Sequence, residues 1–110
     1  MDSVEPVLGS STDRVLAAAD RVPPGAVASY GDIGAAVGVP ARQVGRIMAR
    51  HGWEVAWWRI TDRQGRLPAH LLGEAITHWR EEGIGVRDDG SGCRFDEHRV
   101  AVEVLLGSAR

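Results

Sequence analysis

The residues that could do covalent or metal chemistry are few in this sequence. Cys93 is the single cysteine, so it cannot form an internal disulfide, and it has no cysteine or histidine neighbour at the spacing of a zinc site. A thiol can act as a nucleophile, but Cys93 lies in an acidic segment with Asp88, Asp89 and Asp96, where a thiol is discouraged from ionising. We therefore expect neither a metal ion nor another cofactor.

Arginines gather in the middle of the chain, although the formal net charge of the whole is −2. Between Pro40 and Arg66 only Glu54 and Asp62 are acidic. The arginines of this stretch are Arg42, Arg46, Arg50, Arg59, Arg63 and Arg66. The net charge argues against a protein held on nucleic acid by bulk electrostatics, but this distribution predicts one positive surface that could contact phosphates.

Length and composition indicate one compact domain over residues 1–110. A chain of 110 residues with 44% hydrophobic content can build a single core without metal or disulfide support. No apolar run approaches the roughly 20 residues of a membrane span, and the acidic start of the sequence is unlike a signal peptide. We expect a soluble, cytoplasmic monomer with no membrane partner.

Capping residues and apolar periodicity predict three helices in the first half. Residues 1–10 are expected to fray; a helix then begins around Ser11 and is stopped by the Pro23 to Gly25 turn. A capping box from Ser29 to Asp32 begins a short second helix that ends at Gly38. Pro40 begins a third helix that ends before Gly52. Its apolar face holds Val44, Ile47 and Met48, and its polar face holds Arg42, Gln43, Arg46 and Arg50.

The second half is predicted to be mixed. Residues 55–61 are rich in β-branched and aromatic side chains and predict a short strand, and residues 68–82 have the apolar spacing of a helix closed by Gly83. Residues 100–106 fit a strand or a helix equally well. The expected fold is mainly α, a winged-helix-like helix-turn-helix domain with short β elements.

Several motifs occur in an order that resembles the DNA-binding domain of the alkylguanine-DNA alkyltransferases. The segment from Arg21 to Ile33 contains the proline-glycine turn and the Ser-Tyr-Gly-Asp-Ile signature, and Ala41 to Arg46 is similar to the Ala-Arg-x-Val-Gly recognition helix. Trp57 to Ile60 stands in place of the Pro-Cys-His-Arg-Val motif, and Glu82 to Ile84 follows. The resemblance covers roughly residues 13–86, so residues 87–110 are a divergent tail.

The departures from the active enzymes are informative. Trp57 occupies the position of the alkyl-accepting cysteine, Trp58 that of the histidine that activates it, and Ala56 that of the preceding proline. Glu82 matches the far end of that relay and is left without a proton to relay. Tryptophan at the cysteine position is the mark of the alkyltransferase-like proteins. The resemblance therefore implies a protein that is not an enzyme.

The resemblance also implies a function and its residues. Alkyltransferase-like proteins bind O6-alkylguanine in double-stranded DNA through the minor groove, flip the nucleotide out and hand it to nucleotide excision repair proteins. Arg42 matches the arginine that fills the gap, Tyr30 the tyrosine that rotates the nucleotide, and Gly45 a small residue that allows close approach or packing against the second helix. The implied DNA-binding residues are Ser29, Tyr30, Arg42, Gln43, Gly45 and Arg46, and the implied alkylguanine pocket is Ala56, Trp57, Trp58 and Arg59, with Arg59 bracing the loop. The stretch from Gly65 to Leu71 corresponds to the family's base-covering loop but matches poorly, so no contacts are assigned there.

Two other functions stay open. A helix-turn-helix regulator without lesion preference would bind by sequence and ignore O6 alkylation. An enzyme that transfers the alkyl group to Cys93 would gain the mass of that group on incubation with alkylated DNA.

Overall fold

The computed structural model describes residues 10–107, so the predicted fraying lies outside the described residues except at Ser10. Three helices form the first half: α1 (Ser11–Asp20), α2 (Tyr30–Val37) and α3 (Ala41–His51). Ser10 caps α1 through a reciprocal capping box with Asp13, and Ser29 and Asp32 make the same box for α2. The predicted helices and the second capping box are confirmed.

The turn between α2 and α3 depends on two glycines. Gly38 closes α2 in the left-handed region with φ of 74°, which a glycine adopts without strain. A Cβ on Gly34 would lie 2.3 Å from the carbonyl oxygen of Val39, so only glycine lets the chain turn this tightly. The turn packs α2 against α3 and gives the helix-turn-helix arrangement that the sequence predicted.

The short strand predicted within residues 55–61 is confirmed at the end of this stretch. Two 3-10 turns, η1 (Gly52–Glu54) and η2 (Trp57–Arg59), take up this stretch, and only β2 (Ile60–Thr61) is extended. β2 pairs in parallel with β1 (Ala28–Ser29). The aromatic residues indicated a strand, but Trp57 and Trp58 instead pack as turn residues against the cluster below α4. Tertiary packing here overrides β-propensity.

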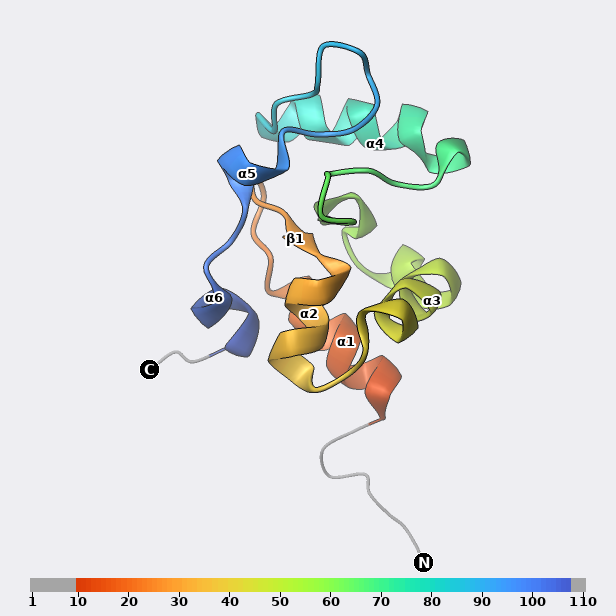
Figure 1. The fold of residues 1–110 in the computed structure, drawn as a ribbon, viewed down its shortest axis with the longest axis vertical. Helices are drawn as coiled ribbons and strands as arrows, with labels where there is room; N and C mark the ends of the chain where they lie inside the picture. Colours follow the sequence, from red (N-terminus) through yellow and green to blue (C-terminus); the bar gives the residue numbers. More distant parts are fainter. Residues whose placement is uncertain (1–9, 108–110) are drawn as a thin grey trace, which may run out of the picture.

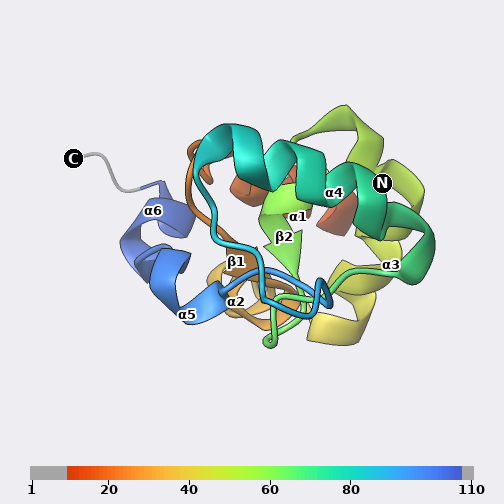
Figure 2. The ribbon, with the colours of Figure 1, turned by 90° about the horizontal axis from the view of Figure 1, so that it is seen from above.

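The second half begins with α4 (Ala69–Glu82), which the sequence predicted. The tail returns past the sheet and forms α5 (Phe95–His98) and α6 (Val102–Leu106), so the undecided stretch 100–106 contains a helix. In Figure 1, α4 lies across one end of the molecule and α1 to α3 gather at the other, with β1 between them. Seen from above, in Figure 2, both strands lie beside α4, while α5 and α6 lie to one side.

Two apolar clusters share the interior. The first joins α1, α2 and α3 with Ile60 and Leu105, and the second joins α4 with Val27, Cys93 and Phe95. Trp79, which is fully buried in the second cluster, donates a hydrogen bond from its indole Nε1 to the carbonyl oxygen of Trp58 (2.7 Å). The turn that holds Trp57 is therefore fixed to α4, while β2 continues into the cluster of the helix-turn-helix.

Candidate nucleic-acid interface

The solvent face of α3 is basic. Val44 and Ile47 are buried on its inner side, whereas Arg42, Arg46 and Arg50 are exposed, as the helical spacing predicted. None of these three arginines makes an ion pair with any of residues 10–107. Arginines without a protein partner can contact phosphates or bases without first breaking an ion pair.

Tyr30 is the first residue of α2 and faces α3. Ser29, whose hydroxyl caps α2 by accepting from the amide of Asp32 (2.9 Å), is buried and fixes the start of the helix. A Cβ on Gly45 would meet only the Tyr30 ring, at an ordinary 4.0 Å, so packing against α2 does not require a glycine at that position. Burial, helped by the charge of Asp62, raises the pKa of the Tyr30 phenol, which therefore stays protonated and able to donate.

An apolar pocket of about 80 Å³ opens between Tyr30 and Trp57. Gly45, Met48 and Ala49 supply the α3 wall. The rest of the lining comes from β2, the loop that precedes α4 and the first turn of α4: Ile60, Leu67, Pro68, His70 and Leu71. Two residues predicted for different roles, Tyr30 from the DNA-binding set and Trp57 from the pocket set, are thus brought to one site.

Trp57 is held by aromatic contacts behind the pocket. Its ring meets Trp58 edge to face (5.6 Å, 84°) and His78 in the same manner (6.0 Å, 83°). Trp58 in turn stacks flat on the imidazole of His78 at 3.6 Å. Such contacts fix the plane of Trp57, which is half-buried and presents part of its indole to the pocket.

Trp58 and Arg59 point away from the pocket, towards Glu82. The Trp58 Nε1 donates to Glu82 Oε2 (2.9 Å), and Arg59 donates from Nε and from its terminal nitrogen (2.6 Å) to the same carboxylate. Arg59 also donates to the carbonyl oxygen of Val22 (3.1 Å), and the amide of Gly25 donates to Glu82 (3.1 Å). Although burial opposes ionisation of Glu82, these hydrogen bonds, above all from Arg59, hold its pKa below the usual range.

Three of the four residues predicted for the alkylguanine pocket lie outside the lining of this apolar pocket. Ala56, Trp58 and Arg59 are not among the residues that line the apolar pocket; Trp58 and Arg59 brace the turn that carries Trp57. The bracing role predicted for Arg59 agrees with its ion pair. Seven lining residues were missed: Met48, Ala49, Ile60, Leu67, Pro68, His70 and Leu71. The loop from Gly65 to Leu71 was flagged without contacts, and the apolar run at Leu67 and Pro68 was the only signal available there.

Cys93 lies elsewhere. It is fully buried in the second cluster, donates its backbone amide to the carbonyl of Gly65 (2.9 Å) and does not line the apolar pocket. Burial raises the pKa of the thiol to about 11. Within residues 10–107 no group of three or more histidine, cysteine, aspartate or glutamate side chains is arranged to hold a metal ion. No helix of that range is long and apolar enough to cross a membrane.

The architecture is that of a helix-turn-helix domain in which an apolar pocket lies beside α3, the basic second helix of the motif. Residues 10–83 match the family described as 6-O-methylguanine DNA methyltransferase, DNA binding domain, and the chain belongs to this family. It is also similar to Atl1 of S. pombe, in a crystal structure with damaged DNA that contains O6-carboxymethylguanine. The identity is 25% and the TM-score 0.69, over 82% of this chain and 94% of that one. On these two findings the chain is classed as alkyltransferase-like. No curated protein matches it.

Proposed function

We propose that this chain binds O6-alkylguanine in duplex DNA and does not transfer the alkyl group. The observation that supports the proposal most strongly is the pocket between Tyr30 and Trp57, because an indole stands there at the family's cysteine position. Neither indole carbon nor indole nitrogen accepts an alkyl group from guanine under mild conditions. The single thiol of the sequence is buried with a raised pKa, in another cluster.

In this proposal α3 enters the minor groove with Arg42 leading. Extruding a guanine costs stacking and pairing, and a side chain that fills the gap offsets part of that cost. Arg42 lies in the first turn of α3, is exposed and has no ion pair among the described residues, so it is available for this role. Tyr30, which stays neutral, lies beside the pocket and can donate to the phosphate of the rotating nucleotide. Gln43 and Arg46 supply further contacts along the same helix.

The pocket favours an alkylated base over guanine for a simple reason. Its walls are mainly apolar, and removing an alkyl group from water is worth about 0.8 kcal/mol for each methylene. At about 80 Å³ the cavity is small beside the roughly 300 Å³ or more of typical ligand sites. It holds an alkyl group as it stands, and a whole base requires the segment from Leu67 to Leu71, which includes the first turn of α4, to move outward from α3.

Handing the lesion to nucleotide excision repair is part of the same proposal. A protein that binds a lesion without removing it helps the cell only if another activity excises the nucleotide. The similarity to Atl1, which was crystallised with damaged DNA, supports lesion binding; the excision step remains our inference.

Equilibrium binding to three matched duplexes tests the proposal. The duplexes carry guanine, O6-methylguanine or a bulkier O6 adduct at one position, and Arg42→Ala is measured beside the native chain. We expect both adducts to bind more tightly than guanine, and Arg42→Ala to reduce that preference. A helix-turn-helix regulator without lesion preference would bind all three alike and show only a uniform loss in Arg42→Ala.

A further inference from the structure

A second, polar groove of about 730 Å³ lies next to the apolar pocket, and Tyr30 lines both. The start of α2 lines this groove together with Asp62 and Arg63 from the loop after β2. Arg99, which lies outside the matched residues 10–83, also lines it. The divergent tail thus contributes a charged side chain to the face that the family domain uses.

The backbone at Arg99 is fixed to the sheet. The amide of Val27 donates to the carbonyl of His98 (2.9 Å), and the amide of Val100 donates to the carbonyl of Val27 (2.9 Å). Residue 99 therefore pairs in parallel with the residue that precedes β1. Because Val27 is only two residues before Ser29, this pairing fixes the position of Arg99 relative to Ser29 and Tyr30.

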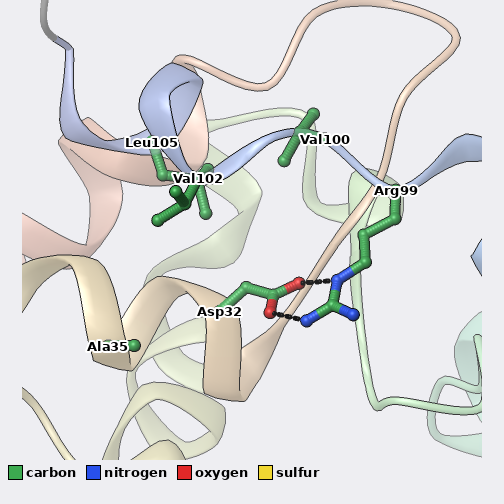
Figure 3. Close-up of a pocket in the computed structure, with 6 residues that line it drawn as sticks. All are labelled: Asp32, Ala35, Arg99, Val100, Val102 and Leu105. Atoms are coloured by element: carbon green, nitrogen blue, oxygen red, sulfur yellow. Dashed lines mark hydrogen bonds and ion pairs between the residues drawn. The ribbon is translucent and has the colours of Figure 1, made fainter.

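The side chain of Arg99 is oriented by its neighbours and keeps N–H groups that could donate to a further acceptor. Two of its nitrogens donate to the two carboxylate oxygens of Asp32, and its guanidinium carbon lies 5.6 Å from the centre of the Phe95 ring. Figure 3 shows that the third nitrogen points away from Asp32. The side chain is 46% exposed. A guanidinium has five N–H groups, so some remain for a second acceptor while the pair with Asp32 stays intact.

We propose that Arg99 contacts a backbone phosphate of the damaged strand, next to the flipped nucleotide; this rests on the lesion binding proposed above. A flipped base stays joined to its strand, so a base in the apolar pocket leaves its neighbouring phosphate beside Tyr30, where the groove begins. Guanidinium groups contact phosphates through paired N–H donors. The charged side chains that line the groove are two acids and two bases, so their net charge is zero: Asp32, Asp62, Arg63 and Arg99. A phosphate would therefore be held by a local contact with Arg99 and not by a general positive potential.

A different role for Arg99 would be to hold Asp32 in the α2 capping box and so position Tyr30. The two roles predict opposite effects of Asp32→Asn, which weakens the pair with Arg99 but leaves an oxygen that can accept from the Ser29 amide in the α2 capping box. If Arg99 contacts phosphate, Asp32→Asn removes a competing negative charge and DNA binds as well or more tightly. If Arg99 only positions Asp32, Asp32→Asn weakens binding as much as Arg99→Gln does.

The test measures affinity for an O6-methylguanine duplex over a range of NaCl concentrations. Each phosphate contact contributes about 0.9 to the slope of log K against log salt for duplex DNA. We expect Arg99→Gln to lower that slope by about one and to weaken binding of the alkylated duplex roughly tenfold. The unmodified duplex should lose less, because the contact forms beside a flipped nucleotide. The matched control is Arg94→Gln, which breaks an exposed arginine–aspartate pair of the same tail, with Asp88, away from the groove. Circular dichroism melting shows that the variants are folded.

An Arg99→Gln slope equal to that of the native chain, or a loss shared by Arg94→Gln, would overturn the phosphate contact. So would an Asp32→Asn variant as weak as Arg99→Gln. These outcomes differ from failure of the proposed function, in which the native chain itself would bind alkylated and unmodified duplexes alike.

Discussion

Glu82→Gln removes one charge and keeps the shape of the side chain, and it should destabilise the fold strongly. Glu82 accepts from Trp58, Arg59 and the amide of Gly25, and its side chain is 12% exposed beside an Arg59 that is 15% exposed. Removing one partner of a well-buried pair leaves the other charge without compensation, which costs about 3–5 kcal/mol when burial is complete. Since both groups keep some access to water, we expect about 2–4 kcal/mol.

That loss can be checked by thermal unfolding. For a chain of 110 residues, 1 kcal/mol corresponds to about 4 °C in Tm, so the midpoint of Glu82→Gln should fall by roughly 8–16 °C. The matched control is Asp88→Asn, which breaks the exposed pair with Arg94 and should shift Tm by no more than about 2 °C. A Glu82→Gln midpoint within 2 °C of the native one would refute the argument that this carboxylate braces the Trp57 turn.

The same carboxylate gives the expectation for pH. The folded-state pKa of Glu82 is lowered, so its contribution to stability is present above the ordinary glutamate pKa and is lost as the pH falls through the folded-state value. The difference in unfolding free energy between the native chain and Glu82→Gln should therefore be constant near neutral pH and shrink in acid. A difference that grows below pH 4 would contradict the sign of the shift.

Three further predictions concern the pocket and its surroundings. Trp57→Ala should weaken binding of a bulky O6 adduct by about tenfold and of an unmodified duplex hardly at all, measured by equilibrium titration; an equal loss on both would contradict the role of the indole. Cys93 should react with a thiol reagent only on the timescale of unfolding, because it is fully buried with a pKa of about 11; rapid labelling of the native chain would contradict the burial. Gly65→Ala should lower Tm by at least about 8 °C, since φ is +78° and a Cβ would lie 2.4 Å from the Cys93 carbonyl oxygen; an unchanged Tm would contradict that contact.

Local signals explain what the sequence predicted correctly. The capping boxes and the glycine that closes α2 act within a few residues, so the bounds of the first helices followed from neighbouring residue types. The faces of α3 followed from its period, because Val44 and Ile47 alternate with arginines at helical spacing. The resemblance then brought Tyr30 and Trp57 into one hypothesis, although 27 positions separate them, and the pocket joins them in space.

Contacts distant in sequence explain what was missed. The β-branched and aromatic composition predicted a short strand within residues 55–61 but not its position at Ile60 and Thr61. Before it, the conformation of the turn at Trp58 is fixed by Glu82, 24 residues further on, and by the ring of His78. Residues 100–106 are apolar at both periods, and only packing of Leu105 into the first cluster selects a helix. The pocket wall from Leu67 to Leu71 also depends on the position of α4 relative to α3. Local sequence patterns do not predict how two helices distant in the chain are placed.

In the proposed function this chain recognises alkylated guanine and leaves it chemically unchanged. The most direct test incubates the protein with a duplex containing one O6-methylguanine, measures its affinity against a matched unmodified duplex, and then determines the intact mass of the protein and the methyl content of the recovered DNA. We expect tighter binding of the alkylated duplex, an unaltered protein mass and DNA that retains every methyl group. Transfer of a methyl group to the protein would replace one hydrogen and raise its mass by about 14 Da. That gain, or equal binding of both duplexes, would contradict the proposed function.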